Sequence, residues 1–309
     1  MNRRLKIKVM GIGGSGSNAV SRMMKKRIEG VELIAVNTDK QDLKKAKAHQ
    51  KIQIGRMATR GLGTGMNPLL GKRAAEEDRE KINNLLKGTD LLFIVCGLGG
   101  GTGTGAAPII AEIARELEIL TIAVVTMPFS FEGRERRRIA RRGEENLKDK
   151  VDTLISVSND KLTALIEPGV SISSAFWFGD ETLRQAVMGI ANLIVLPGII
   201  NIDFADIKMI LKNSGRAIFG IGMGLGENRV KDAISVALSS PLTDLSCSRA
   251  KKVLFNVSGN GEINLVEIDE IAKEIKERVA PDAKIIFGAA QAENLRKKEI
   301  KVTIIATGF

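Results

Sequence analysis

The sequence predicts an α/β fold: a parallel sheet flanked by helices, then a long helix and a smaller α/β domain. Short apolar runs alternate with helical segments through the first half of the chain, and glycine-rich stretches follow two of those runs. This alternation is typical of Rossmann-like parallel sheets, in which a helix crosses from each strand to the next. We expect strands at residues 5–10, 31–36, 91–96 and 120–125, and helices at residues 18–28, 67–86 and 106–117.

A long helical pattern separates the two halves of the chain. Apolar residues recur at spacings of three or four from Ile172 to Leu196, and Pro197 and Gly198 then end the helix. Beyond it we expect helices at residues 206–212, 228–239 and 266–279, and strands at residues 217–223, 252–257, 283–287 and 301–306. This order predicts a second α/β domain with a mixed sheet that includes antiparallel pairs.

The composition is that of a folded globular protein. The chain has 309 residues, of which 44% are hydrophobic and 27% are charged. The start MNRRLKIKV lacks the long apolar region of a secretory signal, and the two cysteines form no spaced motif, so we expect a cytoplasmic protein. His49 is the only histidine, which argues against a histidine-centred catalytic triad or a histidine-rich metal site.

The formal net charge is +11. A basic surface attracts nucleic acid or anionic lipid, or is simply solvated. We favour the solvated surface and expect no specific nucleic-acid partner, because no aromatic residues interleave the basic ones as a stacking platform would require.

The run from Gly97 to Gly105 is the most informative stretch. It follows an apolar strand and precedes a helix, which is where open parallel sheets bind their ligands. Glycines let an anion approach the backbone N–H groups closely, and the start of a helix favours negative charge. We interpret this run as a loop that cradles phosphate, in preference to a flexible connector.

A second glycine loop follows the first strand. Gly11, Gly13 and Gly16 fit the dinucleotide-binding pattern, and Asp39 lies where a ribose-binding acid would stand, so a nicotinamide-dependent oxidoreductase is a serious alternative. Two phosphate-binding loops favour a longer polyphosphate over a single pyrophosphate. The stretch from Gly65 to Arg73 does not fit a Walker loop, because it has one residue too many between its glycines and an arginine in place of Ser or Thr.

Several motifs in fixed order carry a resemblance to a known family. GGGTGTG at residues 99–105 resembles the tubulin signature, and GIGGSGSNAVSRM, AVNTD, TRGLGTGMNP, MPFSFEGRERR, SNDKL, NIDFADI and the terminal VTIIATGF are similar to FtsZ landmarks over nearly all of residues 5–309. The chain is thereby identified as a member of the FtsZ family of bacterial cell-division GTPases. The resemblance implies a GTP-binding domain at residues 1–170, a central helix and connecting loop at 171–200, and a C-terminal activation domain at 201–309.

The resemblance also implies which residues bind GTP and GDP. They are Gly13, Gly14, Ser15, Gly16, Ser17 and Asn18 in the first loop, Gly65 in another, Gly100, Gly101, Thr102 and Gly103 in the phosphate cradle, Glu132 and Arg136 near the ribose, and Asn159, Phe176 and Asp180 around the guanine. A carboxylate such as Asp180 accepts from both N–H groups on guanine's pairing edge, whereas adenine presents an acceptor there. Phe176 fits a core position of the long helix as well as a stacking contact. Mg²⁺ is expected to be held mainly by phosphates and water, without a dedicated metal site.

The catalytic expectation concerns Asn201, Asp203 and Asp206. From spacing alone, Asp203 as a helix cap and Asp206 as a first-turn acid explain the pattern without catalysis. The resemblance implies instead that this loop enters the nucleotide pocket of the next copy in a head-to-tail homopolymer and orients the attacking water. A non-catalytic nucleotide-binding scaffold remains a third alternative.

The sequence departs from the family's pattern in a few places. Ser15 replaces a glycine, Ser158 stands before Asn159 where relatives often have proline, and the charge is basic where relatives are usually acidic. The chain stops at Phe309 without the terminal peptide by which relatives dock membrane-adaptor division proteins. We nevertheless expect it at the division site, on the inner face of the membrane.

Overall fold

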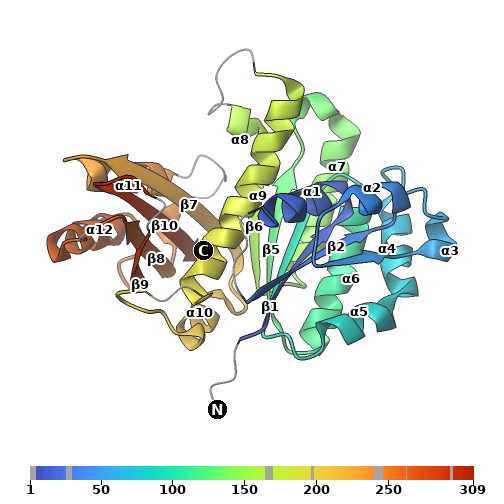
Figure 1. The fold of residues 1–309 in the computed structure, drawn as a ribbon, viewed down its shortest axis with the longest axis horizontal. Coiled ribbons are helices and arrows are strands. Elements are labelled where there is room, and N and C mark those ends of the chain that lie inside the picture. Colours follow the sequence, from blue (N-terminus) through green and yellow to red (C-terminus); the bar gives the residue numbers. More distant parts are fainter. Residues whose placement is uncertain are drawn as a thin grey trace. The chain divides into compact units, whose positions relative to one another are not determined.

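The computed structural model describes residues 5–25, 30–163, 170–195, 198–239, 246–261, 263–292 and 295–309. These form two compact units, one ending at Ala191 and the other beginning at Asn192 (Figure 1). The boundary lies inside helix α9, Ile172–Val195. Its expected end at Leu196 and Pro197 falls outside the described residues. Within the described residues, no helix has the length and hydrophobicity needed to span a bilayer.

The first unit is built on a parallel sheet with strand order β3-β2-β1-β4-β5-β6. The strands are β1 Ile7–Ile12, β2 Val31–Asn37, β3 Gln50–Gln53, β4 Leu91–Gly97, β5 Leu120–Met127 and β6 Thr153–Ser158. Its helices are α1 Gly13–Met23, α2 Lys40–Lys45, α3 Arg56–Thr59, α4 Pro68–Glu77, α5 Arg79–Leu86, α6 Thr102–Glu116, η1 Ser130–Glu132, α7 Arg134–Lys148, α8 Asn159–Thr163 and α9. The expected parallel α/β fold is confirmed.

One buried core holds the helices α4 to α7 against this sheet. Alternate strand residues such as Met10, Ile34 and Ile94 belong to one cluster with Ala74 of α4 and Ile110 of α6. Successive side chains of a strand point to opposite faces of the sheet, so every second residue of each strand faces these helices.

Glycines set the spacing between α4 and the segment that begins α6. A Cβ atom added at Gly71 of α4 would lie 2.2 Å from the Gly101 carbonyl oxygen, and one added at Gly105 would lie 2.0 Å from the Pro68 carbonyl oxygen. Neither distance is tolerable, so the two helices meet backbone to backbone. This contact fixes where the loop before α6 lies.

The second unit has a mixed sheet with strand order β7-β10-β8-β9. Strand β10 is antiparallel to β7 and β8, and β8 is parallel to β9. The strands are β7 Gly215–Leu225, β8 Lys252–Gly259, β9 Lys284–Gln291 and β10 Glu299–Thr307, and the helices are α10 Phe204–Leu211, α11 Arg229–Ser239, η2 Cys247–Arg249 and α12 Leu265–Glu277. The expected antiparallel pairs are present.

Helix α11 lies directly on strand β7. Gly220, Gly222 and Gly224 face it, and a Cβ atom on each would lie 1.9, 1.8 and 1.9 Å from the carbonyl oxygens of Ala237, Ala233 and Arg229. A residue with any side chain would push the helix off the strand at these positions.

Candidate functional site

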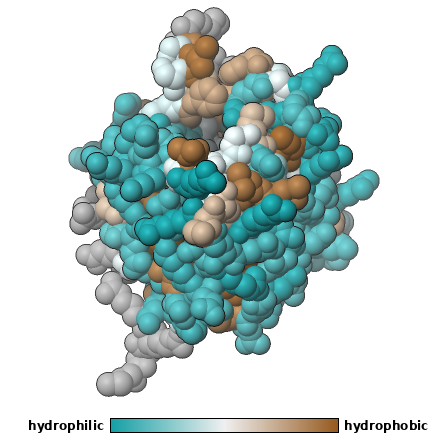
Figure 2. Space-filling model, turned by 90° about the vertical axis from the view of Figure 1, so that its right-hand side faces the viewer, coloured by the Kyte–Doolittle hydropathy of each residue, from teal (hydrophilic) through white to brown (hydrophobic). Residues whose placement is uncertain are grey.

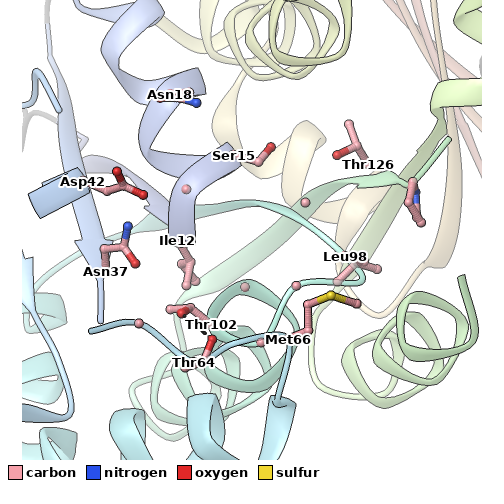
Figure 3. A pocket seen from close by; sticks show the side chains of 18 of the residues that line it. Ile12, Ser15, Asn18, Asn37, Asp42, Thr64, Met66, Leu98, Thr102 and Thr126 are labelled. Atoms are coloured by element: carbon pink, nitrogen blue, oxygen red, sulfur yellow. Dashed lines mark hydrogen bonds between the residues drawn. The ribbon is translucent and has the colours of Figure 1, made fainter. Parts of the chain in front are cut away.

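A cavity of about 520 Å³ lies at the carboxyl ends of the parallel strands in the first unit (Figure 3). Its walls come from the ends of β1, β2, β4 and β5 and from the segments that follow them. A volume of this size is typical of small-molecule sites, and this edge of an open parallel sheet is where they form.

Two helices begin at this cavity, and in both the residue before the first turn has no side-chain oxygen to cap the free backbone N–H groups. Ile12 precedes α1 and Gly101 precedes α6. The positive ends of both helices therefore favour a bound anion.

Glycine is required where these two segments meet. Gly13 has φ +73°, a left-handed conformation, and a Cβ there would lie 3.1 Å from the Gly103 nitrogen. A Cβ at Gly101 would lie 2.2 Å from Thr64 Oγ1. By contrast, a Cβ at Gly100 or Gly65 would meet no heavy atom of the described residues within 4 Å, so their backbones border open space.

The opposite part of the cavity contains the carboxylate of Asp180. Ser15 Oγ lies 3.4 Å from Asp180 Oδ1, and the Arg22 guanidinium nitrogens lie 3.3 and 3.4 Å from Oδ2. Burial raises the pKa of Asp180 to about 6, and the charge and hydrogen bonds of Arg22 and Ser15 act in the opposite direction. Arg22 also stands over the Trp177 ring, 5.5 Å from its centroid.

Buried polar atoms without partners gather at this cavity. Asn37 Nδ2, Arg136 Nε and Asn159 Oδ1 all belong to residues that line it, and none finds a hydrogen-bond partner among the described residues. Such atoms are uncommon in folded proteins and call for a ligand or water. They match a ligand with both polar donors and acceptors, as a nucleotide has.

Aromatic rings border the same region. Phe176 packs edge-on against Phe129 and Phe131, with ring centroids 5.4 and 6.3 Å apart, and remains 40% exposed. Glu132 lies beside them, accepts from the Phe129 backbone at 2.8 Å and pairs with Arg136. A partly exposed ring at a cavity wall is suited to stack on a flat base.

Most of the nucleotide-binding residues expected from the sequence line this one cavity. They are Gly13, Gly14, Ser15, Asn18, Gly65, Gly100, Gly101, Thr102, Gly103, Glu132, Arg136, Asn159, Phe176 and Asp180. Gly16 and Ser17 are not among the described residues that line it. A Cβ at Gly16 would lie 2.3 Å from the Val95 carbonyl oxygen, so Gly16 lets α1 approach β4, and Ser17 is buried.

Other residues that line the cavity were not among the nucleotide-binding residues expected from the sequence. Asn37 ends β2, Thr64 precedes Gly65, and Thr126 lies near the end of β5. The AVNTD and TRGLGTGMNP motifs drew attention to the first two segments, but only contact across the fold shows which of their side chains face the cavity.

The loop with Asn201, Asp203 and Asp206 belongs to the second unit. Asn201 Oδ1 accepts from the Gly198 backbone at 2.7 Å. Asp203 stands at the start of α10 but makes no side-chain capping hydrogen bond to the described helix, and Asp206 lies in its first turn. Asp203 is exposed and Asp206 is half-buried.

The fold and the cavity together define an α/β protein with a binding site for a phosphorylated nucleotide. Comparison with known families makes this specific: the GTPase domain of the Tubulin/FtsZ family matches residues 6–167, and the C-terminal domain of the FtsZ family matches residues 215–309. The chain belongs to the Tubulin/FtsZ family. It is a GTPase, and its GTPase domain implies a site for GTP and GDP.

Solved structures agree with this assignment. An empty FtsZ dimer from M. jannaschii is 44% identical, with a TM-score of 0.94, and the match covers 100% of this chain and 89% of that one. GDP-bound CetZ1 from Haloferax volcanii is 23% identical, with a TM-score of 0.85 over 99% of this chain and 94% of that one, which shows a shared fold. The resemblance noted in the sequence is confirmed, and the oxidoreductase and non-catalytic alternatives are set aside.

Proposed function

We propose that this GTPase assembles head-to-tail into filaments and hydrolyses GTP at a site shared by two adjacent copies. One copy supplies the cavity, and the next supplies Asn201, Asp203 and Asp206. The observation that carries this proposal is that the carboxylates lining the cavity already contact other groups of the same copy.

Among the described residues, four carboxylates line the cavity, and each has a partner. Asp39 Oδ1 accepts from the backbone of Gln41 and Asp42 at 2.8 and 3.0 Å, and Asp42 pairs with Lys45 at 3.9 Å. Glu132 pairs with Arg136, and Asp180 pairs with Arg22. Asp39, Glu132 and Asp180 are thus engaged in the wall and Asp42 forms only an exposed surface pair, so in our proposal the acid that orients the attacking water comes from the next copy.

Asp203 and Asp206 are suited to orient the attacking water. Neither carboxylate pairs with another side chain within the described residues, and Asp203 makes no capping contact that would explain its presence. In the assembled site these carboxylates would accept hydrogen bonds from water and raise its nucleophilicity toward the terminal phosphorus. Asn201 would hold the loop in shape through its contact with Gly198.

The cavity residues would divide the nucleotide between them. The N–H groups at the starts of α1 and α6 would bind phosphate oxygens, Glu132 and Arg136 would contact the ribose, and Asn159, Phe176 and Asp180 would hold the guanine. Mg²⁺ would be held mainly by phosphate oxygens and water, because the cavity carboxylates are already engaged. Residues 1–170, 171–200 and 201–309 would act as the GTP-binding domain, the central helix with its loop, and the activation domain.

Exposed hydrophobic side chains between residues 57 and 69 support self-association. Met57, Leu62 and Leu69 are 84%, 81% and 70% exposed, and Leu62 lines the cavity. Figure 2 shows hydrophobic side chains gathered in the upper part of an otherwise mainly hydrophilic face. Exposed apolar surface of this kind marks a contact with another protein. Solved relatives include an FtsZ dimer and a GTPγS-bound CetZ2 protofilament.

The cellular role that follows is bacterial-type cell division. Filaments of this protein would form the cytokinetic ring in the cytoplasm, at the inner face of the membrane, with membrane-adaptor division proteins as partners. No specific nucleic-acid partner is expected.

A pelleting assay combined with phosphate release tests the shared site. We expect GTP, and not GDP, to give sedimenting filaments, and GTPase activity per copy to rise steeply with protein concentration. Asp203→Asn and Asp206→Asn should keep GTP binding and assembly while turnover falls by about a hundredfold or more, because the water loses its orienting base. Asp232→Asn, an exposed acid in the first turn of α11 in the same unit, is the matched control.

Two results would contradict the proposal. Constant activity per copy over the whole concentration range would show that one copy hydrolyses GTP alone. Loss of GTP binding in the Asp203 variant would show that this residue maintains the fold and does not act in turnover.

A further inference from the structure

A groove of about 470 Å³ lies between α1 and the wall formed by α2 and the two residues that follow it. Figure 1 shows these two helices next to each other in the first unit. The groove shares Gly14, Asn18 and Asp42 with the nucleotide cavity, so the two hollows adjoin. We call it the α1–α2 groove. Its volume is that of a small-molecule site.

Positive charge dominates the α1–α2 groove. Among the described residues, its charged lining consists of the cations Arg22, Lys25, Lys45 and Lys47 and the carboxylate Asp42. Lys25 and Lys47 form no ion pair within the described part of the chain. Lys45 lies 3.9 Å from Asp42, and the two side chains are 79% and 55% exposed, so this pair is weak. The charge of the groove is thus largely uncompensated, which favours a bound anion.

A buried hydroxyl at the groove lacks a partner. Ser17 lines the groove and is 2% exposed, and its Oγ makes no hydrogen bond among the described residues. Such atoms are uncommon in folded proteins and call for a ligand or water. The family resemblance implied that Ser17 binds the nucleotide, yet it lines this groove and is not among the described residues that line the nucleotide cavity.

The second serine of the groove holds its two walls together. Ser21 Oγ donates to the Ser17 carbonyl at 2.7 Å and accepts from the Lys47 backbone N–H at 2.9 Å. This contact ties the segment after α2 to α1. The wall that carries Lys47 is therefore fixed relative to the wall that carries Arg22 and Lys25, as a binding site requires.

The placement of the cations suits an anion with several oxygens. Arg22 and Lys25 come from α1 and the residues after it, whereas Lys45 and Lys47 come from the opposite wall. Arg22 uses Nε and Nη2 in its contacts with Asp180, at 3.4 and 3.3 Å, and its Nη1 group makes no hydrogen bond within the described residues. A phosphate group has three or more oxygens and accepts charge-assisted hydrogen bonds from arginine and lysine together.

We propose that the α1–α2 groove is a second anion site, separate from the GTP cavity, and that it binds a ligand that carries phosphate groups. Arg22 and Lys25 hold its oxygens from one side, and Lys45 and Lys47 hold them from the other. A ligand oxygen, or a water molecule bound to it, supplies the acceptor that the Ser17 hydroxyl lacks. This site does not depend on the assembly of filaments.

Calorimetric titration of the GDP-saturated protein with pyrophosphate tests the site. Excess GDP fills the nucleotide cavity, so that pyrophosphate is kept out of it, and Mg²⁺ is left out because pyrophosphate would sequester it. We expect one pyrophosphate to bind per copy. In Lys45→Met and in Lys47→Met the affinity should fall about threefold, because each change removes one charge from the wall of the groove.

Lys44→Met is the matched control, because Lys44 is an exposed lysine of the same helix but is not among the residues that line the groove. It removes the same charge one position away and should leave the affinity for pyrophosphate nearly unchanged. Equal losses in Lys44→Met and Lys45→Met would overturn the proposal, since they would show general attraction to a basic surface.

The phosphate group could belong to a free solute or to a lipid headgroup, and vesicles distinguish the two. Sedimentation with phosphatidylglycerol vesicles, but not with phosphatidylcholine vesicles, that weakens in Lys45→Met and not in Lys44→Met would place a lipid headgroup in the groove. Binding of pyrophosphate without such sedimentation would place a free solute there. Binding of neither pyrophosphate nor phosphatidylglycerol vesicles would overturn the proposal.

Discussion

At the scale of single residues, opposing effects set the pKa of the Asp180 carboxylate. Burial in the cavity wall disfavours its charge, while Arg22 and Ser15 favour it, and the resulting pKa is about 6. The proposed guanine contact needs the ionised form, because only a carboxylate accepts from two N–H groups at once. Nucleotide binding is therefore linked to protonation of this group.

We expect GTP affinity to be constant above about pH 7 and to weaken as the pH falls through 6. The sign follows because protonation of free Asp180 competes with binding, with a limiting slope of about tenfold per pH unit. Titrations with GTP between pH 5 and 8 measure this. Asp180→Asn should bind GTP weakly with no such slope, and Arg22→Met should move the midpoint to higher pH. An unchanged slope in Asp180→Asn would assign the effect to another group.

Single elements show how far the sequence determines the structure. Strands β2, β4 and β5 were predictable because each is a mostly apolar run, as strands buried on both faces are. Strand β1 was predictable because polar and apolar residues alternate along residues 5–10. Strand β3 was not predicted, because its sequence QKIQ has one buried residue, Ile52, and it forms only by pairing with β2. Its identity depends on a partner distant in sequence.

The helix expected at residues 67–86 shows the same limit. It is divided into α4 and α5 at Asp78, whose carboxylate accepts from the Gly55 backbone at 2.8 Å. The same limit applies to the site. Its glycine loops are recognisable in the sequence, whereas the orientation of Asn37 and Thr64 toward the cavity depends on neighbouring strands and helices. Local patterns predict the loops, and the tertiary fold selects the side chains.

The backbone contact of α11 with β7 leads to a stability prediction. In Gly222→Ala the new methyl group would lie 1.8 Å from the Ala233 carbonyl oxygen, so the helix has to shift. We expect the free energy of unfolding to fall by about 1–3 kcal/mol or more, measured by urea denaturation. Met223→Ala, the next residue and 49% exposed, is the control and should change it by less than about 0.5 kcal/mol. Equal losses in both would contradict this packing role.

At the scale of the whole molecule, charge opposes the proposed assembly. Each copy carries a formal charge of +11, so copies in a filament repel one another. The screening length falls from about 30 Å at 0.01 M salt to about 8 Å at 0.15 M. The long-range repulsion between copies is therefore strongest at low salt.

We accordingly expect the critical concentration for GTP-dependent sedimentation to decrease as NaCl rises from 0.01 to 0.15 M. KCl at the same ionic strength serves as the control and should give the same decrease, because screening depends on ionic strength and not on which monovalent salt supplies it. If the critical concentration rose with salt instead, attraction between opposite charges at the contact would outweigh the net repulsion.

The contact between Trp177 and Arg22 has a practical consequence. Trp177 is the only tryptophan in a chain that has no tyrosine, so its intrinsic fluorescence comes from one known place. Its indole ring lies next to the guanidinium that holds Asp180. Because indole emission responds to nearby charge, the unlabelled protein contains its own optical reporter of events at the Asp180 end of the cavity.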